Sequence, residues 1–93
     1  MSETIREPVQ WFAEQMELKL RTKDKTCGSY GWRECRNLEG MLGLWRHLRE
    51  EVEEAETEIG AALTPEWNRD LCLQELVDIA NLAMMLADNL RSK

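Results

Sequence analysis

Apolar residues recur at helical spacing near the N-terminus of the chain, where they form one stripe. Pro8 suits the first turn of a helix, because the N–H that proline lacks is not needed there. The stripe consists of Val9, Phe12, Ala13, Met16 and Leu20. This spacing predicts a helix that fades near Lys23. Residues 24–33 contain Gly28 and Gly31 and are expected to form a loop.

The middle of the chain has the most regular apolar pattern. Its apolar residues step by four or three positions, as in a packed helical seam: Met41, Trp45, Leu48, Val52, Ala55 and Ile59. This pattern predicts a second helix, and Gly60 is suited to end it.

The last part of the chain predicts a third helix that is apolar nearly all round. Thr64–Pro65 suits its N-cap and first turn, and the pattern runs to about Arg91, with a break expected near Asn68. The two faces carry Leu76, Ala80, Ala83, Ala87 and Leu90, and Ile79, Leu82, Met85 and Leu86. A helix with apolar residues on both faces is expected to be buried.

No strand pattern competes with these helices, so the sequence predicts an all-α fold. The 93 residues form one domain, residues 1–93, whose core would be marginal alone. We therefore expect a small antiparallel bundle of three to four helices, completed by oligomerisation. Trp11 and Leu18, on a different face from Phe12, indicate at least a dimer, and a homodimer and a homotetramer both remain open.

Charge and composition exclude several classes of partner. The net charge of −6 argues against a nucleic-acid surface, which needs a basic stripe. The longest apolar stretch, residues 79–87, is too short to span a membrane, and no signal peptide is visible, so we expect a cytoplasmic protein. The three cysteines favour free or structural thiols, and Cys27, Cys35 and His47 match no compact zinc motif.

Two groups of acidic residues fall on the second and third predicted helices. The first reads E-E-x-x-E and consists of Glu50, Glu51 and Glu54; the second reads E-x-x-D and consists of Glu75 and Asp78. Residues three or four apart share a helix face, so antiparallel packing can bring the two clusters together. The first group alone is more simply the solvated side of a helix, since Glu50 lies almost opposite the apolar seam.

Glu75 and Asp78 are more informative, because their helix is expected to be buried. Buried carboxylates must be paired, hydrogen-bonded or bound to metal, and the nearest basic residues of this helix, Arg69 and Arg91, stand at its ends. Oxygen ligands favour a hard ion, Mg²⁺ or Mn²⁺. Such an ion commonly completes its shell with phosphates, so hydrolysis of a phosphate ester is the expected chemistry.

The paired acidic motifs, the stretch from Glu75 to Asp88 and the segment WFAEQME at 11–17 resemble the all-α nucleoside triphosphate pyrophosphohydrolases. This superfamily includes MazG, the dimeric dUTPases and phosphoribosyl-ATP pyrophosphohydrolase, and the resemblance to small MazG-like proteins covers nearly the whole chain. It implies Mg²⁺-dependent cleavage of a nucleoside or deoxynucleoside triphosphate to the monophosphate and pyrophosphate. It also implies a site in which Glu50 binds a further metal or positions the attacking water, and the metal ligands are Glu51, Glu54, Glu75 and Asp78.

The predicted loop is the expected contact with the substrate. Lys25 brings positive charge, and Trp32 offers a flat surface. MazG-like proteins often carry a Lys-Gly-Gly-Trp stretch here, whereas this chain has the longer KTCGSYGW at 25–32. Trp32 could equally be a buried aromatic residue that anchors a solvent-exposed loop. Asn81 could hydrogen-bond a sugar or base, or face water or a partner helix.

A second hypothesis is an acidic helical interaction module without catalysis. Such a module would bind its partner through the apolar seam from Trp45 to Ile59. The two hypotheses differ in one measurement, the release of pyrophosphate from nucleoside triphosphates in the presence of Mg²⁺.

Overall fold

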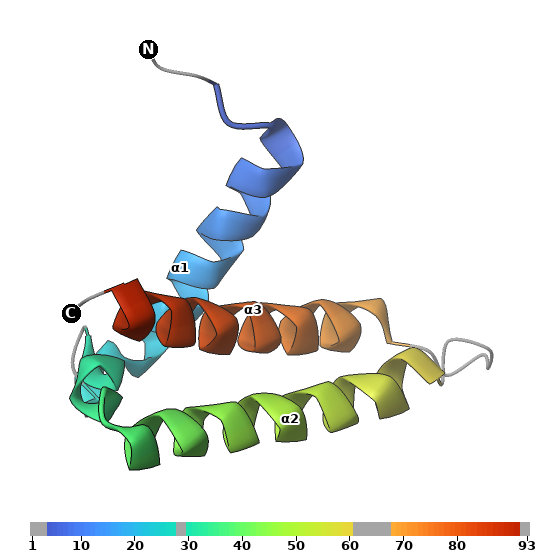
Figure 1. The fold of residues 1–93 in the computed structure, drawn as a ribbon. Helices are drawn as coiled ribbons and strands as arrows, with labels where there is room; N and C mark the ends of the chain where they lie inside the picture. The colour runs from blue at the N-terminus through green and yellow to red at the C-terminus, as the bar shows by residue number, and fades with distance from the viewer. Residues whose placement is uncertain (1–3, 28–29, 61–67, 92–93) are drawn as a thin grey trace.

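The computed structural model describes residues 4–27, 30–60 and 68–91, and no strand occurs in these ranges. The elements are α1 (Glu7–Cys27), a 3₁₀ helix η1 (Gly31–Cys35), α2 (Leu38–Gly60) and α3 (Arg69–Arg91). The all-α prediction is confirmed for this part of the chain. Helices α2 and α3 run side by side and antiparallel, and α1 crosses α3 so that its N-terminal half extends away from the pair (Figure 1). None of the described helices is long and apolar enough to cross a membrane.

Asparagine side chains cap the starts of α2 and α3. Asn37 Oδ1 accepts a hydrogen bond from the N–H of Gly40 at 2.7 Å, and Asn68 Oδ1 accepts one from the N–H of Leu71 at 3.0 Å. Each cap satisfies an N–H group that has no partner within its helix. Helix α3 thus begins directly after the predicted break, and the predicted Thr64–Pro65 cap lies outside the described residues.

The C-terminal end of α1 differs from the prediction. The helix continues through residues 24–27, which the sequence pattern assigns to a loop. No glycine or proline stands between Pro8 and Gly28, and Asp, Lys and Thr each cost a helix less than about 1 kcal/mol. Helices α2 and α3 end at the predicted residues, Gly60 and Arg91.

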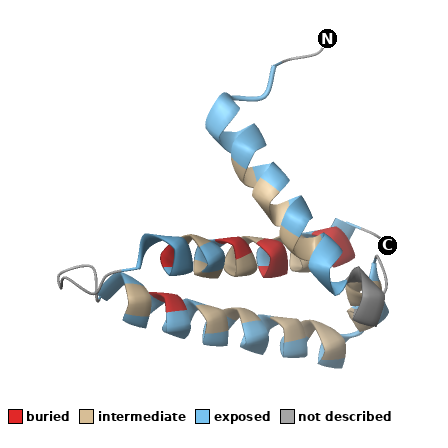
Figure 2. Cartoon of the chain, turned by 180° about the vertical axis from the view of Figure 1, so that it is seen from behind, coloured by how far each residue is buried: buried red, intermediate tan, exposed pale blue. Residues whose placement is uncertain are grey.

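The core of the single chain is small and lies mainly on α3. Among the described residues, the buried side chains are the apolar Ala55, Cys72, Val77 and Leu82 and the polar Asn81, Asp88 and Asn89. Figure 2 shows most buried positions on α3 and one on α2. Ala83, Ala87 and Leu90 are exposed, because α1 and α2 cover only part of α3. The prediction that this helix is buried all round is therefore wrong for the single chain.

The face of α2 that packs on α3 is rotated from the predicted seam. Trp45, Val52 and Ile59 are 50 %, 43 % and 49 % exposed. From Met41 onward, the positions of α2 that are at least partly buried step by three and four residues: Met41, Leu44, Leu48, Glu51, Ala55 and Glu58. Two glutamates thus occupy positions where a helical seam normally holds apolar side chains.

Polar contacts tie η1 to the C-terminal end of α3. Trp32 Nε1 and Arg33 Nε both donate to Oδ2 of Asp88 at 2.9 Å. Asn89 Nδ2 donates to the carbonyl oxygen of Trp32 at 3.0 Å. These bonds satisfy a buried carboxylate and the NH₂ of a buried amide, while Asn89 Oδ1 has no hydrogen-bond partner among the described residues. Trp32 therefore anchors η1 to α3, one of the two roles that the sequence leaves open for it.

Candidate metal centre

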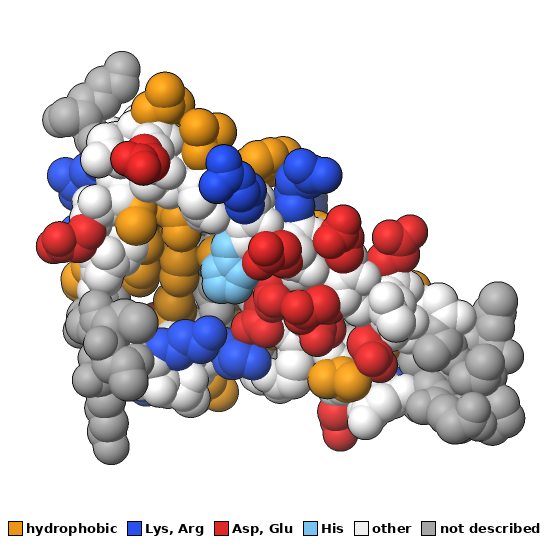
Figure 3. All heavy atoms as spheres, turned by 90° about the horizontal axis from the view of Figure 1, so that it is seen from below, with side chains coloured by type: hydrophobic (Ala, Val, Ile, Leu, Met, Phe, Trp, Pro, Cys, Tyr) orange, Lys and Arg blue, Asp and Glu red, His pale blue; other side chains and the backbone are white. Residues whose placement is uncertain are grey.

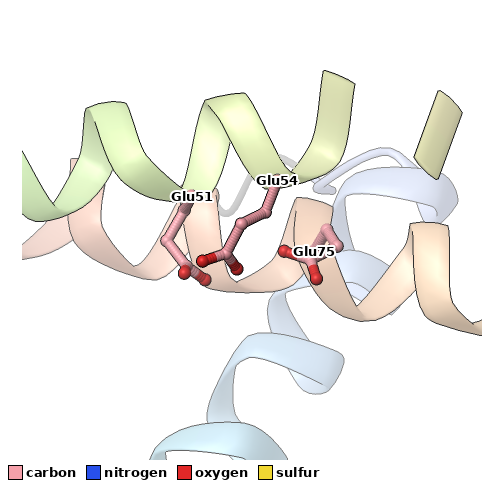
Figure 4. A group of neighbouring side chains, drawn as sticks. All are labelled: Glu51, Glu54 and Glu75. Carbon is pink, nitrogen blue, oxygen red and sulfur yellow. The ribbon is translucent and has the colours of Figure 1, made fainter. Parts of the chain in front are cut away.

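Three carboxylates converge between α2 and α3. Glu51 and Glu54 project from α2 and Glu75 from α3, and Figure 4 shows them pointing toward one another. One carboxylate oxygen of each lies within 4.8 Å of the other two. Figure 3 shows acidic side chains gathered on one face of the molecule. Antiparallel packing thus joins the two acidic motifs, as the sequence predicts.

The charged forms of Glu51 and Glu75 are disfavoured where they stand. Burial raises the pKa of Glu51 to about 7, with a hydrogen bond to Asp78 and the charge of Glu54 acting in the same direction. Burial also raises the pKa of Glu75, and the charges of Glu54 and Asp78 add to the effect. Glu75 Oε2 is fully buried and has no hydrogen-bond partner among the described residues. A bound cation would reverse each of these penalties.

The donor set fits a hard divalent cation. All three clustered atoms are carboxylate oxygens, the donors that Mg²⁺ prefers. Opposite oxygens of a Mg²⁺ shell stand about 4.2 Å apart, from metal–oxygen distances of about 2.1 Å. The three clustered oxygens lie within 4.8 Å of one another, which is close to that span, so small side-chain movements would complete the site. The unpartnered Glu75 Oε2 is an acceptor that such an ion would satisfy.

Asp78, the fourth predicted ligand, is paired with Lys19 of α1. Lys19 Nζ lies 3.3 Å from Asp78 Oδ1 and donates to Gln74 Oε1 at 2.8 Å. Asp78 also contributes to the raised pKa of Glu51, and both residues line the same pocket as Lys19. This ion pair connects α1 to α3 at the edge of the site.

The sequence interpretation missed Lys19, although a signal is present. Lys19 follows Phe12 by seven residues and Met16 by three, so it falls within the apolar stripe of α1. All three residues are partly buried. A partly buried ammonium group is expected to have a paired acid nearby, and Asp78 is that acid.

A pocket of about 220 Å³ opens beside the acidic cluster, between the three α-helices. Its polar and charged walls are Lys19, Lys23, His47, Glu51, Asp78 and Asn81. Its apolar walls are Leu20, Leu44, Leu82 and Met85. Since Glu51 and Asp78 are part of the wall, a ligand in this pocket would lie directly against the acidic cluster.

Asn81 and Glu50 differ in how they relate to this pocket. Asn81 lines it and is only 4 % exposed. Its Nδ2 donates to the carbonyl oxygen of Met16 at 3.3 Å, and its buried Oδ1 has no partner within the described residues. Glu50 is exposed on α2 and does not belong to the three-carboxylate cluster.

Trp32 is not among the residues that line the described pocket. Trp32 binds Asp88, which follows Asp78 by ten residues and so lies about 15 Å further along α3. Lys25 is in the last turn of α1, and its side chain lies outside the described part of the structure. A direct contact of either residue with substrate stays a prediction.

Comparison with protein-family models, with curated protein sequences and with solved structures finds no match for this chain. The MazG-like resemblance therefore rests on the acidic motifs and their flanking sequence.

Proposed function

We propose that this chain hydrolyses nucleoside or deoxynucleoside triphosphates to the monophosphate and pyrophosphate, with Mg²⁺ as cofactor and Mn²⁺ as a substitute. The convergence of Glu51, Glu54 and Glu75 beside a pocket is the observation that carries this proposal. The MazG-like resemblance of the same acidic motifs supports the same reaction.

The residues of the site divide into ion-holding and substrate-holding groups. Glu51, Glu54 and Glu75 would hold the ion, with Asp78 as the fourth ligand that the resemblance assigns. When bound, the ion would neutralise phosphate charge and orient the scissile group for attack by water. The apolar pocket walls would shield the base or sugar from water, and Asn81 would hydrogen-bond it.

Glu50 keeps the role that the resemblance gives it, binding a further ion or positioning the attacking water. Its exposed position on α2 leaves it accessible to a ligand or to a second subunit.

The surface of the chain supports the proposed self-association into a dimer or tetramer. The chain, with a mass of 10.9 kDa, exposes 7216 Å², whereas a compact monomer of that mass exposes about 5,600 Å². The difference exceeds the roughly 800 Å² that each partner buries in a standard interface. Exposed Trp45, Val52 and Ile59 on α2, and Trp11 and Leu18 on α1, are the apolar side chains available for it.

Pyrophosphate release tests the proposed reaction. Metal-free protein is supplied with Mg²⁺ and a panel of canonical and modified nucleoside triphosphates, and pyrophosphate is quantified. Changes to the outer shell of metal sites cost about 10–100-fold, so Glu75→Ala should lower kcat at least about 100-fold. Glu56→Ala, on an exposed position of the same helix as Glu51, is the matched control. If no triphosphate is cleaved and Glu75→Ala and Asp78→Ala leave metal binding unchanged, the proposal is wrong.

The non-catalytic interaction module remains the second candidate function. The half-exposed side chains of Trp45, Val52 and Ile59 favour it, because such a surface suits a partner helix. The same assay separates the two candidates, since a module of this kind releases no pyrophosphate and does not require the acidic cluster.

A further inference from the structure

A lysine side chain already provides a counter-charge at the acidic cluster. Lys19 Nζ lies 3.3 Å from Asp78 Oδ1, and its side chain is only 27 % exposed. Lys19 and Asp78 both line the pocket. The ammonium group thus neutralises one carboxylate at the edge of the space that a ligand would fill.

Asp78 cannot serve both Lys19 and a metal ion equally well. Its carboxylate is not one of the three clustered groups, but Asp78 follows Glu75 by three residues on α3 and lines the same pocket as Glu51. A divalent ion in the cluster and the Lys19 ammonium carry charge of the same sign, so they compete for Asp78. An ion that draws Asp78 toward it therefore weakens the pairing with Lys19.

We propose that Lys19 is a phosphate-binding residue. Asp78 pairs with its ammonium group until a divalent ion binds to the acidic cluster. This assignment rests on the proposed function, because the phosphate would be that of the triphosphate substrate. A phosphate group would replace Asp78 as the partner of Lys19, and ammonium groups are common phosphate ligands. The ion and the phosphate should then bind cooperatively, each raising the affinity of the other by the same factor.

The first test titrates Mn²⁺ alone into metal-free protein by calorimetry. Lys19→Met removes the competing ammonium and keeps the apolar part of the side chain, so Mn²⁺ should bind about fivefold more tightly. Arg21→Met is the control: it removes the same charge from the same helix, and Arg21 pairs with Glu17 at an exposed position. If Lys19→Met binds Mn²⁺ no more tightly than Arg21→Met, the proposal is overturned.

The second test uses inorganic phosphate as the probe. In wild-type protein, phosphate should raise the melting temperature more with Mn²⁺ present than without it. Lys19→Met should lose this extra shift, and Lys19→Arg should keep part of it, because the charge remains. An equal shift in wild type and Lys19→Met overturns the proposal. If Lys19→Met does not melt cooperatively, Lys19→Gln supplies the same comparison.

Steady-state kinetics link the assignment to the reaction. With saturating Mg²⁺, Lys19→Met should raise KM for a cleaved triphosphate about tenfold, while Arg21→Met should not. If wild-type protein binds no Mn²⁺ and cleaves no triphosphate, the proposed function itself fails. If wild type binds and cleaves while Lys19→Met behaves like Arg21→Met, only the role of Lys19 is rejected.

Discussion

Trp32 Nε1 donates a hydrogen bond to Asp88 Oδ2 at 2.9 Å and so joins η1 to the last turns of α3. The same carboxylate accepts hydrogen bonds from Arg33 Nε at 2.9 Å and Arg91 Nε at 3.0 Å. The hydrogen bond from Arg33 is the largest cause that holds the pKa of Asp88 well below its usual range, and the hydrogen bond from Trp32 is the second largest. One buried anion thus holds η1 against α3.

Replacing this anion should loosen η1 and destabilise the fold. Asp88→Asn removes the charge that matches Arg33 and turns an amide NH₂ toward groups that are themselves donors. We expect the melting temperature, followed by circular dichroism, to fall by several degrees. Glu34→Gln, which removes an exposed charge from η1 itself, should leave the melting temperature nearly unchanged. Equal melting temperatures for Asp88→Asn and wild type would show that η1 does not depend on this contact.

Two glycines of α2 offer a matched test of how closely η1 packs. A Cβ on Gly40 would lie 2.7 Å from Cα of Cys35, whereas one on Gly43 would meet nothing within 4 Å. Gly40→Ala should therefore lower the free energy of unfolding by about 1–3 kcal/mol, the usual cost of overpacking. Gly43→Ala should raise it by roughly 0.5–1 kcal/mol, because alanine favours the helix. Urea unfolding measures both, and stabilisation by Gly40→Ala would contradict the structure.

Local sequence features predict the helices and the acidic cluster well. Gly60 marks the end of α2 as predicted, whereas the caps at Asn37 and Asn68 come from the structure. The acidic cluster follows from the i, i+3 spacing of Glu51 and Glu54 and from antiparallel packing that brings Glu75 of α3 to them. The spacing could not show which face of α2 packs on α3. Trp45 is apolar and belongs to the predicted seam, yet its side chain is half exposed. Glu51 instead occupies a partly buried position on the face of α2 that packs on α3.

The sequence pattern does not predict polar pairs between residues that are far apart in the chain. The Lys19–Asp78 pair and the Trp32–Asp88 hydrogen bond join residues that are more than fifty positions apart. Helical periodicity assigns each residue to a face, but it does not fix how far one helix is shifted along another. Only the packed helices therefore show that Lys19 belongs to the candidate site.

Self-association should depend on the exposed apolar face of α2. Wild-type protein is expected to sediment as a species heavier than the 10.9 kDa chain. Val52→Lys places a charge in the middle of that face, where burying it would be costly, and should shift the species toward monomer. Glu53→Lys changes an exposed neighbour and serves as the control. Sedimentation velocity measures both, and a monomeric wild type would contradict the proposed assembly.

A divalent ion should stabilise the protein through the acidic cluster. An ion present at about one hundred times its Kd adds about 2.7 kcal/mol by mass action, which corresponds to roughly 14 °C for a domain of this size. Mn²⁺ or Mg²⁺ should therefore raise the melting temperature relative to EDTA at equal ionic strength. Glu75→Gln should largely abolish the shift, and Glu56→Gln should retain it. No shift at millimolar metal would count against a metal site.

The metal-free protein should become less stable as the pH rises through neutrality. The pKa of Glu51 is raised to about 7 and that of Glu75 is also raised, whereas an unfolded glutamate titrates near about 4.3. Between these values the folded protein binds more protons than the unfolded chain, so the free energy of unfolding falls with rising pH. In EDTA, the melting temperature should thus be higher at about pH 5.5 than at about pH 8. The lowered pKa of Asp88 acts in the opposite direction, but only in acid below about pH 4.

Metal should remove most of this pH dependence, because the ion takes the place of the protons that the carboxylates otherwise bind. With saturating Mg²⁺, stability at about pH 8 should recover toward or above its value at about pH 5.5. Glu51→Gln should flatten the profile in EDTA, since its amide does not titrate, and Glu56→Gln should leave the slope unchanged. Thermal melts across this range, with and without Mg²⁺, provide the measurement. A melting temperature that rises steadily toward alkaline pH in EDTA would mean that Glu51 and Glu75 are ionised without cost, and the electrostatic case for a metal centre would be lost.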